Sequence, residues 1–408
     1  MAQLLGIAIQ NYRALRNIRI GQIGYGDGTE LPRLVCLIGP NGCGKSTLLD
    51  AFGFLADCLR EGVEAACDKP HRGGFDRVRT QGQFGPIAFQ LYFREALQSR
   101  PITYRVEIDL DRGGPVVTTE VLRQRRKGQK SGQPFPFLKL DCGQGEAWSG
   151  NTIEGGEESS KVAVKLDDPT RLGITTLGQL KDHPRIVGLR AYIEGWYLSY
   201  FVPDAARTLP PSGVQRHLDR TGANLGNYLQ FLRRTHPERF QAVLNAIAAK
   251  IPGIQSISCE DSPDRRLLIQ FNESGYTDPF FQANMSDGTL KLFAYLLLLQ
   301  DPEPYPLIGI EEPENGLYHR LLRTLAEEFL DHARGERETQ LVVTTHAPAF
   351  VDALTPDQVW LMQKNADGGS SIERTADIPT VKALFGQGIP LGSLWFSRHL
   401  QERGFGGA

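Results

Sequence analysis

Apolar and polar positions change their period along the chain, and each change predicts a different kind of element. Alternation over residues 4–9 and 18–23 predicts two strands, joined by a turn over 11–17. A short apolar run begins at residue 34 and predicts a buried strand. Helical spacing over 46–60 then predicts a helix directly after it.

The next stretch predicts a loop followed by an antiparallel sheet. Residues 71–85 are polar, basic and rich in glycine, as loops are. Alternating runs separated by Gly, Pro or charged breaks predict strands over 87–93, 102–110, 116–122 and 135–140. Pro136 would confine the last strand to an edge, because proline cannot donate to a ladder. Residues 143–160 are rich in Gly, Ser and Glu and predict a mobile excursion from the sheet.

The second half of the chain begins with helices and returns to strands. Helical spacing covers 177–191 and 223–250, and Pro237 is placed to start a second helix within the latter stretch. No sustained heptads follow, so we expect a short arm rather than a coiled coil. Strands are predicted over 254–259 and 267–272. From residue 286 onward helices and strands alternate, as in an α/β core.

These patterns predict an α/β fold organised in four segments. At 408 residues the chain is too long for one ordinary core, and about two lobes are expected. We expect the N-terminal part of the core over 1–85, an inserted antiparallel β region over 86–170, a short helical arm over 171–253, and the C-terminal part of the core over 254–408.

Composition narrows the class of protein. The chain is 40% hydrophobic and 23% charged, as in globular proteins with a sizeable core. Its net charge of -2 gives no bulk attraction to nucleic acid, so any such contact depends on a local patch. The six cysteines form no CxxC pair, and no apolar run approaches the ~20 residues that span a bilayer. A cytoplasmic protein with free thiols and no membrane contact is the simplest interpretation.

The apolar run from residue 34 leads into a phosphate-binding motif, GPNGCGKST. It has the form Gly39-x-x-x-x-Gly44-Lys45-Ser46 between a strand and a helix. Glycines at 39, 42 and 44 let backbone N–H groups and a helix N-terminus point at one phosphate site. Lys45 would reach the β- and γ-phosphates, and the Ser46 hydroxyl would take one position on Mg²⁺. The motif predicts a nucleotide-binding loop.

A second apolar strand, LIGIEEPE over 307–314, ends in acids. Beside the phosphate-binding loop in a parallel sheet, it would deliver carboxylates to the edge where phosphates bind. Glu311 would then hold Mg²⁺ through water, and Glu312 would polarise the attacking water. Taken alone, an apolar strand followed by acids is equally consistent with a strand that simply leads into a loop and has no part in a site.

Two further segments complete the pattern. LVVTTH over 341–346 ends in His346, which at a strand tip can hydrogen-bond a γ-phosphate. NMSDGTLK over 284–291 places Ser286, Asp287 and Gly288 at a helix N-terminus, a second anion site. Each of these is structural more often than functional when it stands alone. The order of the four signals in one chain favours function.

With these motifs in this order, and a large insertion between the first and second, the chain resembles the ATP-binding-cassette (ABC) ATPases of the SMC and RecF group. It is more closely similar to stand-alone bacterial predicted ATPases, relatives of the ATPase halves of OLD nucleases and of the Septu and PARIS defence ATPases. The specific parts are residues 4–60 and 285–361. The resemblance implies a P-loop ABC-type ATPase core with an inserted β region and a short helical arm, binding ATP and Mg²⁺.

The resemblance also implies roles residue by residue. It assigns nucleotide binding to Gly39, Asn41, Gly42, Gly44, Lys45, Ser46 and Thr47 in the Walker A loop and to Ser286, Asp287 and Gly288 in the signature motif. Glu311 and Glu312 match the Walker B pair, with Glu312 as the catalytic carboxylate, and His346 matches the switch histidine. In that family the signature of one subunit closes over the nucleotide of another, so a homodimer with two ATPs is expected.

The chain departs from the family pattern at four points. Met285 stands where the signature usually has Leu, a mild change of size. Glu311 stands where Asp is commoner, which keeps the charge and lengthens the reach to Mg²⁺. Gln81 and Gln83 are both candidates for the glutamine that senses the metal. The roughly sixty residues after His346 are few for an added nuclease domain.

Two basic features leave alternatives open. The turn over 11–17 either carries Arg13 and Arg16 to the edge of the nucleotide or leaves them on a solvated hairpin. Residues 123–130, RQRRKGQK, form a basic hairpin tip that either touches a nucleic-acid backbone or is simply solvated.

The leading hypothesis is an ATPase that dimerises on ATP and couples closure to a nucleic acid or an effector protein, in DNA maintenance or phage defence, with double-stranded DNA as the candidate nucleic acid. The alternative is a nucleotide-gated scaffold that restrains a toxin or nuclease. A transporter motor fits the large β insertion poorly.

Overall fold

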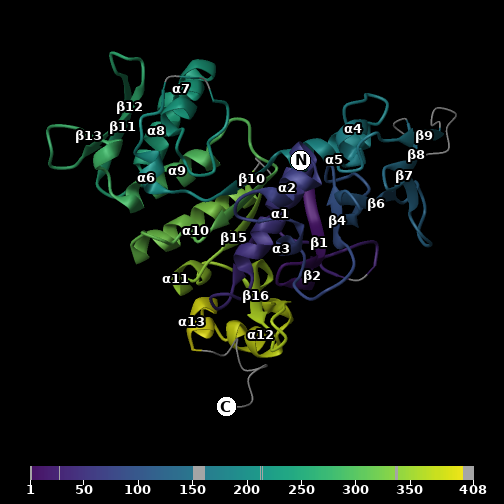
Figure 1. Ribbon diagram of the computed structural model, residues 1–408. Coiled ribbons are helices and arrows are strands. Elements are labelled where there is room, and N and C mark those ends of the chain that lie inside the picture. Colours follow the sequence, from purple (N-terminus) through teal and green to yellow (C-terminus); the bar gives the residue numbers. More distant parts are fainter. Residues whose placement is uncertain are drawn as a thin grey trace.

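In the computed structural model, which describes residues 2–26, 28–149, 161–211, 213, 215–335 and 339–397, the chain is built on one six-stranded and one eight-stranded sheet. Figure 1 shows two lobes that spread from a shared centre, one carrying β4 to β9 and the other carrying α6 to α9 with β11 to β13. The molecule narrows toward the end formed by α12 and α13. The α/β fold class and two-lobed organisation expected from the sequence are confirmed.

The six-stranded sheet lies at this centre, with the order β10-β14-β15-β3-β16-β17. Its strands are β10 (Trp196–Ser199), β14 (Leu307–Glu311), β15 (Gln340–Thr344), β3 (Leu34–Ile38), β16 (Val359–Lys364) and β17 (Ser370–Arg374). All neighbours are parallel except the last pair. Because helices cover both faces, β3 is apolar and buried at every position.

The two faces of this sheet belong to different hydrophobic cores. Val35 and Leu37 of β3 pack in a core with α1 (Lys45–Glu61) and the eight-stranded sheet. Cys36 and Ile38 point the other way, into a core with α9 (Asp287–Leu299), α10 (His319–Arg334) and α11 (Pro348–Val351). The alternation along one strand thus divides the molecule into its two lobes.

The eight-stranded sheet is antiparallel throughout, with the order β2-β1-β4-β5-β6-β7-β8-β9. Its strands are β1 (Gln3–Tyr12), β2 (Leu15–Gly21), β4 (Ile87–Arg94), β5 (Ile102–Asp111), β6 (Gly114–Gln124), β7 (Phe135–Asp141), β8 (Gln144–Trp148) and β9 (Lys161–Lys165). Since β1 pairs with β4, the N-terminal hairpin and the strands predicted as an insertion form one continuous sheet. The strand pairing continues across residue 85, where the first and second predicted segments meet. The division of the chain into four segments stays a prediction.

Local expectations about this sheet need three corrections. The strand with Pro136 is internal rather than at an edge. Its ladder with β8 covers only residues 138–141, so Pro136 is paired with β6 alone, next to a bulge, and no ladder N–H is missing on the other side. The predicted loop over 71–85 contains a short helix, α3 (Phe75–Val78). The predicted excursion over 143–160 begins as β8, and its residues 150–160 lie outside the described part of the chain.

The predicted helical arm is divided between the two cores. Helices α4 (Gly173–Leu177) and α5 (Pro184–Glu194) pack with the eight-stranded sheet, whereas α7 (Leu225–Thr235) and α8 (Pro237–Ala248) pack with α9. Pro237 does begin a helix, as predicted. A small sheet of β11 (Ile254–Asp261), β12 (Leu267–Glu273) and β13 (Phe280–Phe281) completes the second lobe. The remaining helices are α2 (Val63–Asp68), α6 (Pro203–Ala206), α12 (Pro379–Gly386) and α13 (Leu391–Phe396).

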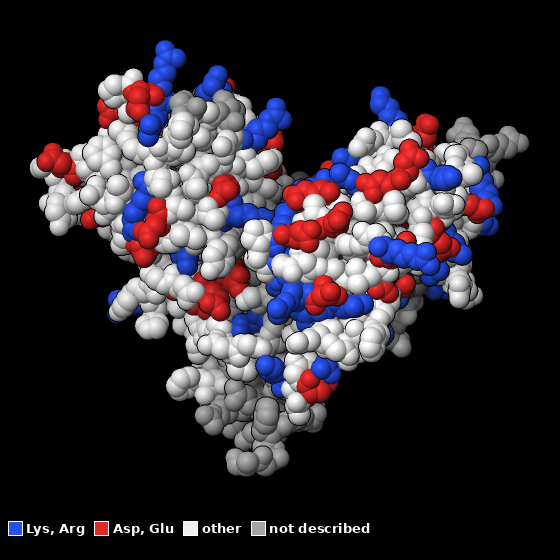
Figure 2. All heavy atoms as spheres, viewed as in Figure 1, with Lys and Arg blue, Asp and Glu red and all other residues white. Residues whose placement is uncertain are grey.

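The mixed charges on the surface and the free cysteine thiols are as the composition predicts. Lys and Arg are interspersed with Asp and Glu over the face in Figure 2, without one dominant sign. At the predicted basic tip, the Arg125 and Arg126 guanidinium groups lie over the Tyr25 and Phe135 rings, at 4.3 and 4.5 Å from the ring centroids. All six cysteines are free thiols. Within the described ranges, none of the helices is long and apolar enough to cross a membrane.

The second core depends on α9, which the sequence makes apolar on almost every face. Phe293 is fully buried and meets the edge of Phe271, with ring centroids 5.4 Å apart. We expect Phe293→Ala to lower the free energy of unfolding by about 3–5 kcal/mol, because it leaves a cavity. Phe396→Ala is the matched control, since that ring is 81% exposed, and should change stability by less than about 0.5 kcal/mol. Urea unfolding followed by fluorescence distinguishes them, and equal shifts would contradict this assignment of the core.

Candidate functional site

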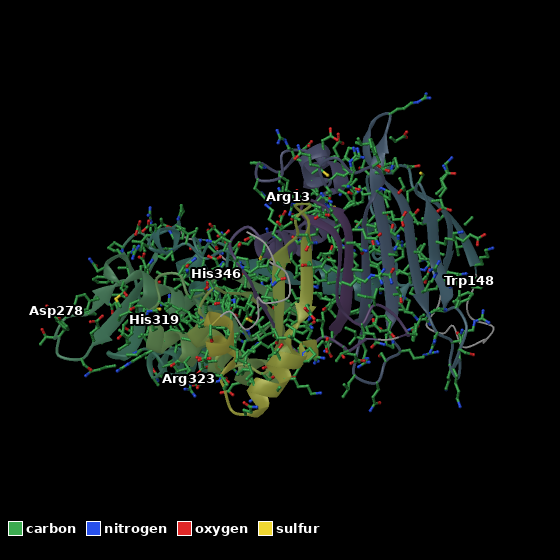
Figure 3. The ribbon with its side chains drawn as sticks, turned by 90° about the horizontal axis from the view of Figure 1, so that it is seen from below. Arg13, Trp148, Asp278, His319, Arg323 and His346 are labelled. Carbon is green, nitrogen blue, oxygen red and sulfur yellow. The ribbon has the colours of Figure 1, made fainter. Side chains whose placement is uncertain are left out.

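Three of the predicted motifs meet at one edge of the six-stranded sheet. Strands β14, β15 and β3 are consecutive neighbours, and all run parallel. Glu311 pairs with Thr344, and Thr344 pairs with Leu37, so the carboxyl ends of the three strands lie level. The acids, the histidine and the phosphate-binding loop follow these ends directly. Figure 3 places His346 near the middle of the molecule, between Trp148 and Asp278 at its two extremes.

In the phosphate-binding loop, the side chain of Lys45 is held in place by hydrogen bonds to the loop itself. The Lys45 ammonium is buried and donates to the carbonyl oxygens of Gly39 and Pro40, at 2.9 and 3.2 Å. Burial lowers the pKa of Lys45, although the nearby thiol of Cys43 and the acids act in the opposite direction. A phosphate oxygen would replace these carbonyls as the partner of the ammonium.

Gly44 is required by the shape of this loop. Its φ of 107° is one that side chains rarely adopt, and an added Cβ would lie 2.4 Å from the Ser370 hydroxyl oxygen. The loop therefore turns tightly into α1, whose first turn carries Ser46 and Thr47. Asn41, Gly42 and Ser46 are exposed at the surface of the loop, where a ligand can reach them.

The residues predicted to hold Mg²⁺ suit an ion that arrives with phosphates. The Ser46 hydroxyl is exposed, and Glu311 is half-buried at the end of β14. Magnesium typically takes one or two protein oxygens, with water and substrate phosphates completing the octahedron. In the part of the chain that the structure describes, no group of three or more His, Cys, Asp or Glu forms a metal-binding cluster. This donor set fits an ion shared with a nucleotide rather than a dedicated protein cage.

Glu312 occupies a strained backbone position directly after β14. Its φ is 42°, in the left-handed region that non-glycine residues rarely enter. The Glu312 N–H donates to the Thr344 carbonyl oxygen at 3.1 Å and lies 3.1 Å from the Thr344 hydroxyl. This turn aims the carboxylate at His346, with 3.1 Å between Oε1 and Nε2, and Asn315 Nδ2 donates to Oε2 at 2.9 Å. The two residues predicted as catalytic are therefore in contact.

Glu314 is a contributor that the motif comparison did not single out. Its carboxylate accepts from the His346 backbone N–H, which ties the acidic loop to the tip of β15. Burial raises the pKa of Glu314, and its hydrogen bonds act against that rise. Its position three residues after Glu311, in the same acidic run, was the available signal in the sequence.

The signature segment lies at the N-terminus of α9, as predicted. The Ser286 hydroxyl caps the helix by accepting from the Thr289 N–H at 3.2 Å. Lys291 Nζ donates to the Asn315 carbonyl oxygen at 2.8 Å, and a Cβ on Gly288 would lie 2.7 Å from the Gly316 carbonyl oxygen. The start of α9 is thus packed onto the loop that follows the acids.

A fourth strand reaches the same edge and was absent from the sequence prediction. Strand β10 pairs in parallel with β14, and Ser199 lies opposite Ile310. Tyr200 follows the end of this strand and is 65% exposed. Gln81 and Gln83, the two candidates for the metal-sensing glutamine, stand on the loop that precedes β4, and the choice between them stays a prediction. With four residues, β10 is too short for its alternation to be distinguished from its helical surroundings.

Arg13 and Arg16 line a cleft of about 680 Å³ near the phosphate-binding loop. Arg77, Arg79 and Gln81 contribute to the same wall. Both arginines are held by acids, Arg13 by Asp50 at 3.1 Å and Arg16 by Asp367 at 2.6 Å. The Ser370 N–H donates to the Ala14 carbonyl oxygen at 2.8 Å, and Ser370 also contacts Gly44, so the cleft and the loop adjoin.

A phosphate-binding loop, an acidic strand and a histidine strand in adjacent parallel register define a P-loop ATPase core. The chain belongs to the AAA_21 family, described as "AAA domain, putative AbiEii toxin, Type IV TA system", whose model matches residues 34–352. No curated protein matches the chain.

The fold is that of SMC heads. The chain is similar to the Smc head domain with an extended coiled coil bound to the C-terminal domain of ScpA from Pyrococcus furiosus, with a TM-score of 0.54, 13% identity, and 95% of this chain and 100% of that one covered. A second structure, the SmcHead bound to the C-winged helix domain of ScpA, gives a TM-score of 0.49 and 15% identity, with 91% and 96% covered. The expected resemblance to the SMC group is confirmed.

The close packing of Gly288 against Gly316 predicts that position 288 does not tolerate a side chain larger than hydrogen. Gly288→Ala should destabilise the protein by about 1–3 kcal/mol, because backbone must move to admit the methyl group. Gly386→Ala is the control, since that glycine also lies in a helix and has open space around it. Thermal unfolding measures both, and a Gly288→Ala protein as stable as the control would contradict the observed packing.

Proposed function

We propose that this protein binds ATP with Mg²⁺, hydrolyses it, and dimerises on ATP to act on a nucleic acid or an effector protein. The observation that carries the proposal is the contact between Glu312 and His346 at the edge that also carries the Lys45 loop. One acid, one histidine and one lysine follow the ends of three neighbouring strands, at the edge where a γ-phosphate would lie. This arrangement suits positioning and charge stabilisation, on which phosphoryl transfer depends.

Each residue has a defined task in this proposal. Lys45 and the N–H groups of the loop hold the β- and γ-phosphates, while Ser46 and Glu311 hold the ion. When bound, Mg²⁺ supplies charge neutralisation across the phosphates. Glu312 accepts a hydrogen bond from the attacking water and orients it. Asn315 and His346 fix the Glu312 carboxylate. In the proposal, His346 would also contact the γ-phosphate.

The cleft beside the loop gives room for the rest of the nucleotide. Its volume of about 680 Å³ is within the range of ligand pockets, and it adjoins the phosphate-binding loop through Ser370. We place the ribose and base there, with the guanidinium groups of Arg13 and Arg16 against them. This assigns the N-terminal turn to the nucleotide rather than to solvent.

We propose the dimer because each chain has one copy of each motif. The chain has one phosphate-binding loop and one signature, and Ser286 is exposed at the N-terminus of α9. In the closed form, the signature of one subunit meets the γ-phosphate held by the other. The description of the family names a toxin and a toxin–antitoxin system, which supports an effector partner of that kind. Arg125 and Arg126 keep their positive charge while their guanidinium groups lie over aromatic rings, so the basic tip stays open to either alternative, a nucleic-acid backbone or solvent.

ATP turnover is the first test. Wild-type protein should hydrolyse ATP with Mg²⁺, and Lys45→Ala should reduce turnover to background, because the phosphates lose their cation. Glu312→Gln should lower kcat by about 10²–10⁴-fold while ATP binding persists. Steady-state phosphate release with and without linear double-stranded DNA measures this. Turnover equal in wild type and Lys45→Ala would reject the ATPase and favour the nucleotide-gated scaffold.

The dimer is tested separately with the variant that binds without turnover. Glu312→Gln should sediment as a dimer with saturating ATP and Mg²⁺ and as a monomer with ADP. Lys45→Ala serves as the control that should stay monomeric with either nucleotide. A Glu312→Gln protein that remains monomeric with ATP would overturn the proposed closure.

The strand end at Tyr200 gives a further expectation. Because β10 is adjacent to β14, with Ser199 opposite Ile310, we expect the Tyr200 hydroxyl to act near the metal. Tyr200→Phe should lower kcat with little change in KM. Unchanged kcat in Tyr200→Phe would remove this residue from the site.

A further inference from the structure

The signature segment carries a carboxylate where an anion is expected to bind. Asp287 is the first residue of α9, next to the Ser286 cap, and its side chain is 59% exposed. A helix N-terminus attracts negative charge through its N–H groups and its dipole. An acid at this position suits an isolated helix, but it repels a phosphate that approaches the same N–H groups.

Arg207 lies against this carboxylate. Its guanidinium forms an ion pair with Asp287 and a second one with Asp204, the latter at 2.6 Å. The same group donates to the Met285 carbonyl oxygen at 2.9 Å, directly before the cap. Among the ion pairs of the described residues, this is the one that Asp287 makes.

The arginine is held in place by its surroundings. Thr208, the next residue, accepts a hydrogen bond from Gln282 Nε2 at 3.2 Å, and Gln282 is buried. Gln282 Oε1 in turn accepts from the Ile269 N–H at 3.1 Å, inside the small sheet. The Arg207 backbone is therefore fixed to the segment that leads into the signature, and the guanidinium needs no large rearrangement to stay on Asp287.

We infer that Arg207 is a positioning residue that neutralises Asp287, so that the signature can close over the triphosphate bound by a second copy of this chain. The inference rests on the proposed ATP-driven dimer. On the open surface the ion pair contributes little to stability, as exposed pairs do. In the closed interface, water is excluded, and an uncompensated carboxylate beside phosphates becomes strongly unfavourable.

The test first removes the positive charge of Arg207 and then also removes the negative charge of Asp287. In the Glu312→Gln background, Arg207→Gln should raise the ATP concentration for half-maximal dimer formation by about tenfold or more at low salt. Glutamine keeps a donor for the Met285 carbonyl. Adding Asp287→Asn should return dimer formation to near the parent value, because the repulsion is gone. Sedimentation at several ATP concentrations provides the measurement.

A matched control and a salt series sharpen the result. Arg233 pairs with Asp261 at 2.7 Å and is exposed to a similar degree as Arg207, so Arg233→Gln removes the same charge away from the signature and should not affect dimer formation. Raising the salt concentration should shrink the Arg207→Gln defect, since it screens the Asp287 repulsion. Arg207→Lys retains the charge and should dimerise nearly as well as the parent.

The outcomes separate this inference from the function on which it rests. A Glu312→Gln parent that stays monomeric with ATP rejects the proposed dimer itself. A parent that dimerises while Arg207→Gln matches it overturns the role of Arg207. An Arg207→Gln defect that Asp287→Asn fails to rescue also overturns neutralisation, and indicates direct contact of Arg207 with the phosphate. Thermal unfolding of every variant confirms that folded proteins are being compared.

Discussion

The parallel register of β14, β15 and β3 is the constraint on which the rest of the molecule depends. Hydrogen bonds between these strands keep their carboxyl ends level, with Glu311 opposite Thr344 and Thr344 opposite Leu37. A slip of one residue would exchange the side chains that face the two cores, sending Cys36 toward the wrong lobe. The packing of two hydrophobic cores therefore fixes the geometry of the polar edge.

That edge stores backbone strain where the chemistry is proposed. Glu312 adopts a left-handed conformation, at a cost of about 1–3 kcal/mol for a non-glycine residue. Thr344 binds its N–H, while His346 and Asn315 hold its carboxylate. The strained turn points the acid away from the strand direction and toward the neighbouring strand, which a relaxed continuation of β14 would not do.

Within one chain, the signature segment at the start of α9 packs against the edge of the sheet that carries the acids. Lys291 and Gly288 pack on the loop that follows the acids, while Arg207 and Gln282 tie the same segment to the connection after β10. Two strands of the sheet edge therefore reach the start of α9 through short connections. A change at the acidic loop has a direct physical path to the surface that we propose closes on a second subunit.

The sequence by itself determined the elements with strong local patterns: the helix after Gly44, the apolar strands that end at Glu311 and Thr344, and the cap at Ser286. Their periodicity and motif spacing lie within a few residues, so no distant contact is needed to find them. Only the tertiary structure decided the rest. Strand β10 is too short to predict and exists because β14 offers it a partner. Pro136 fits into an internal strand because the ladder with β8 ends before it. The ion pair of Arg207 with Asp287 joins residues far apart in sequence, which local patterns cannot encode because they carry no information about distant partners.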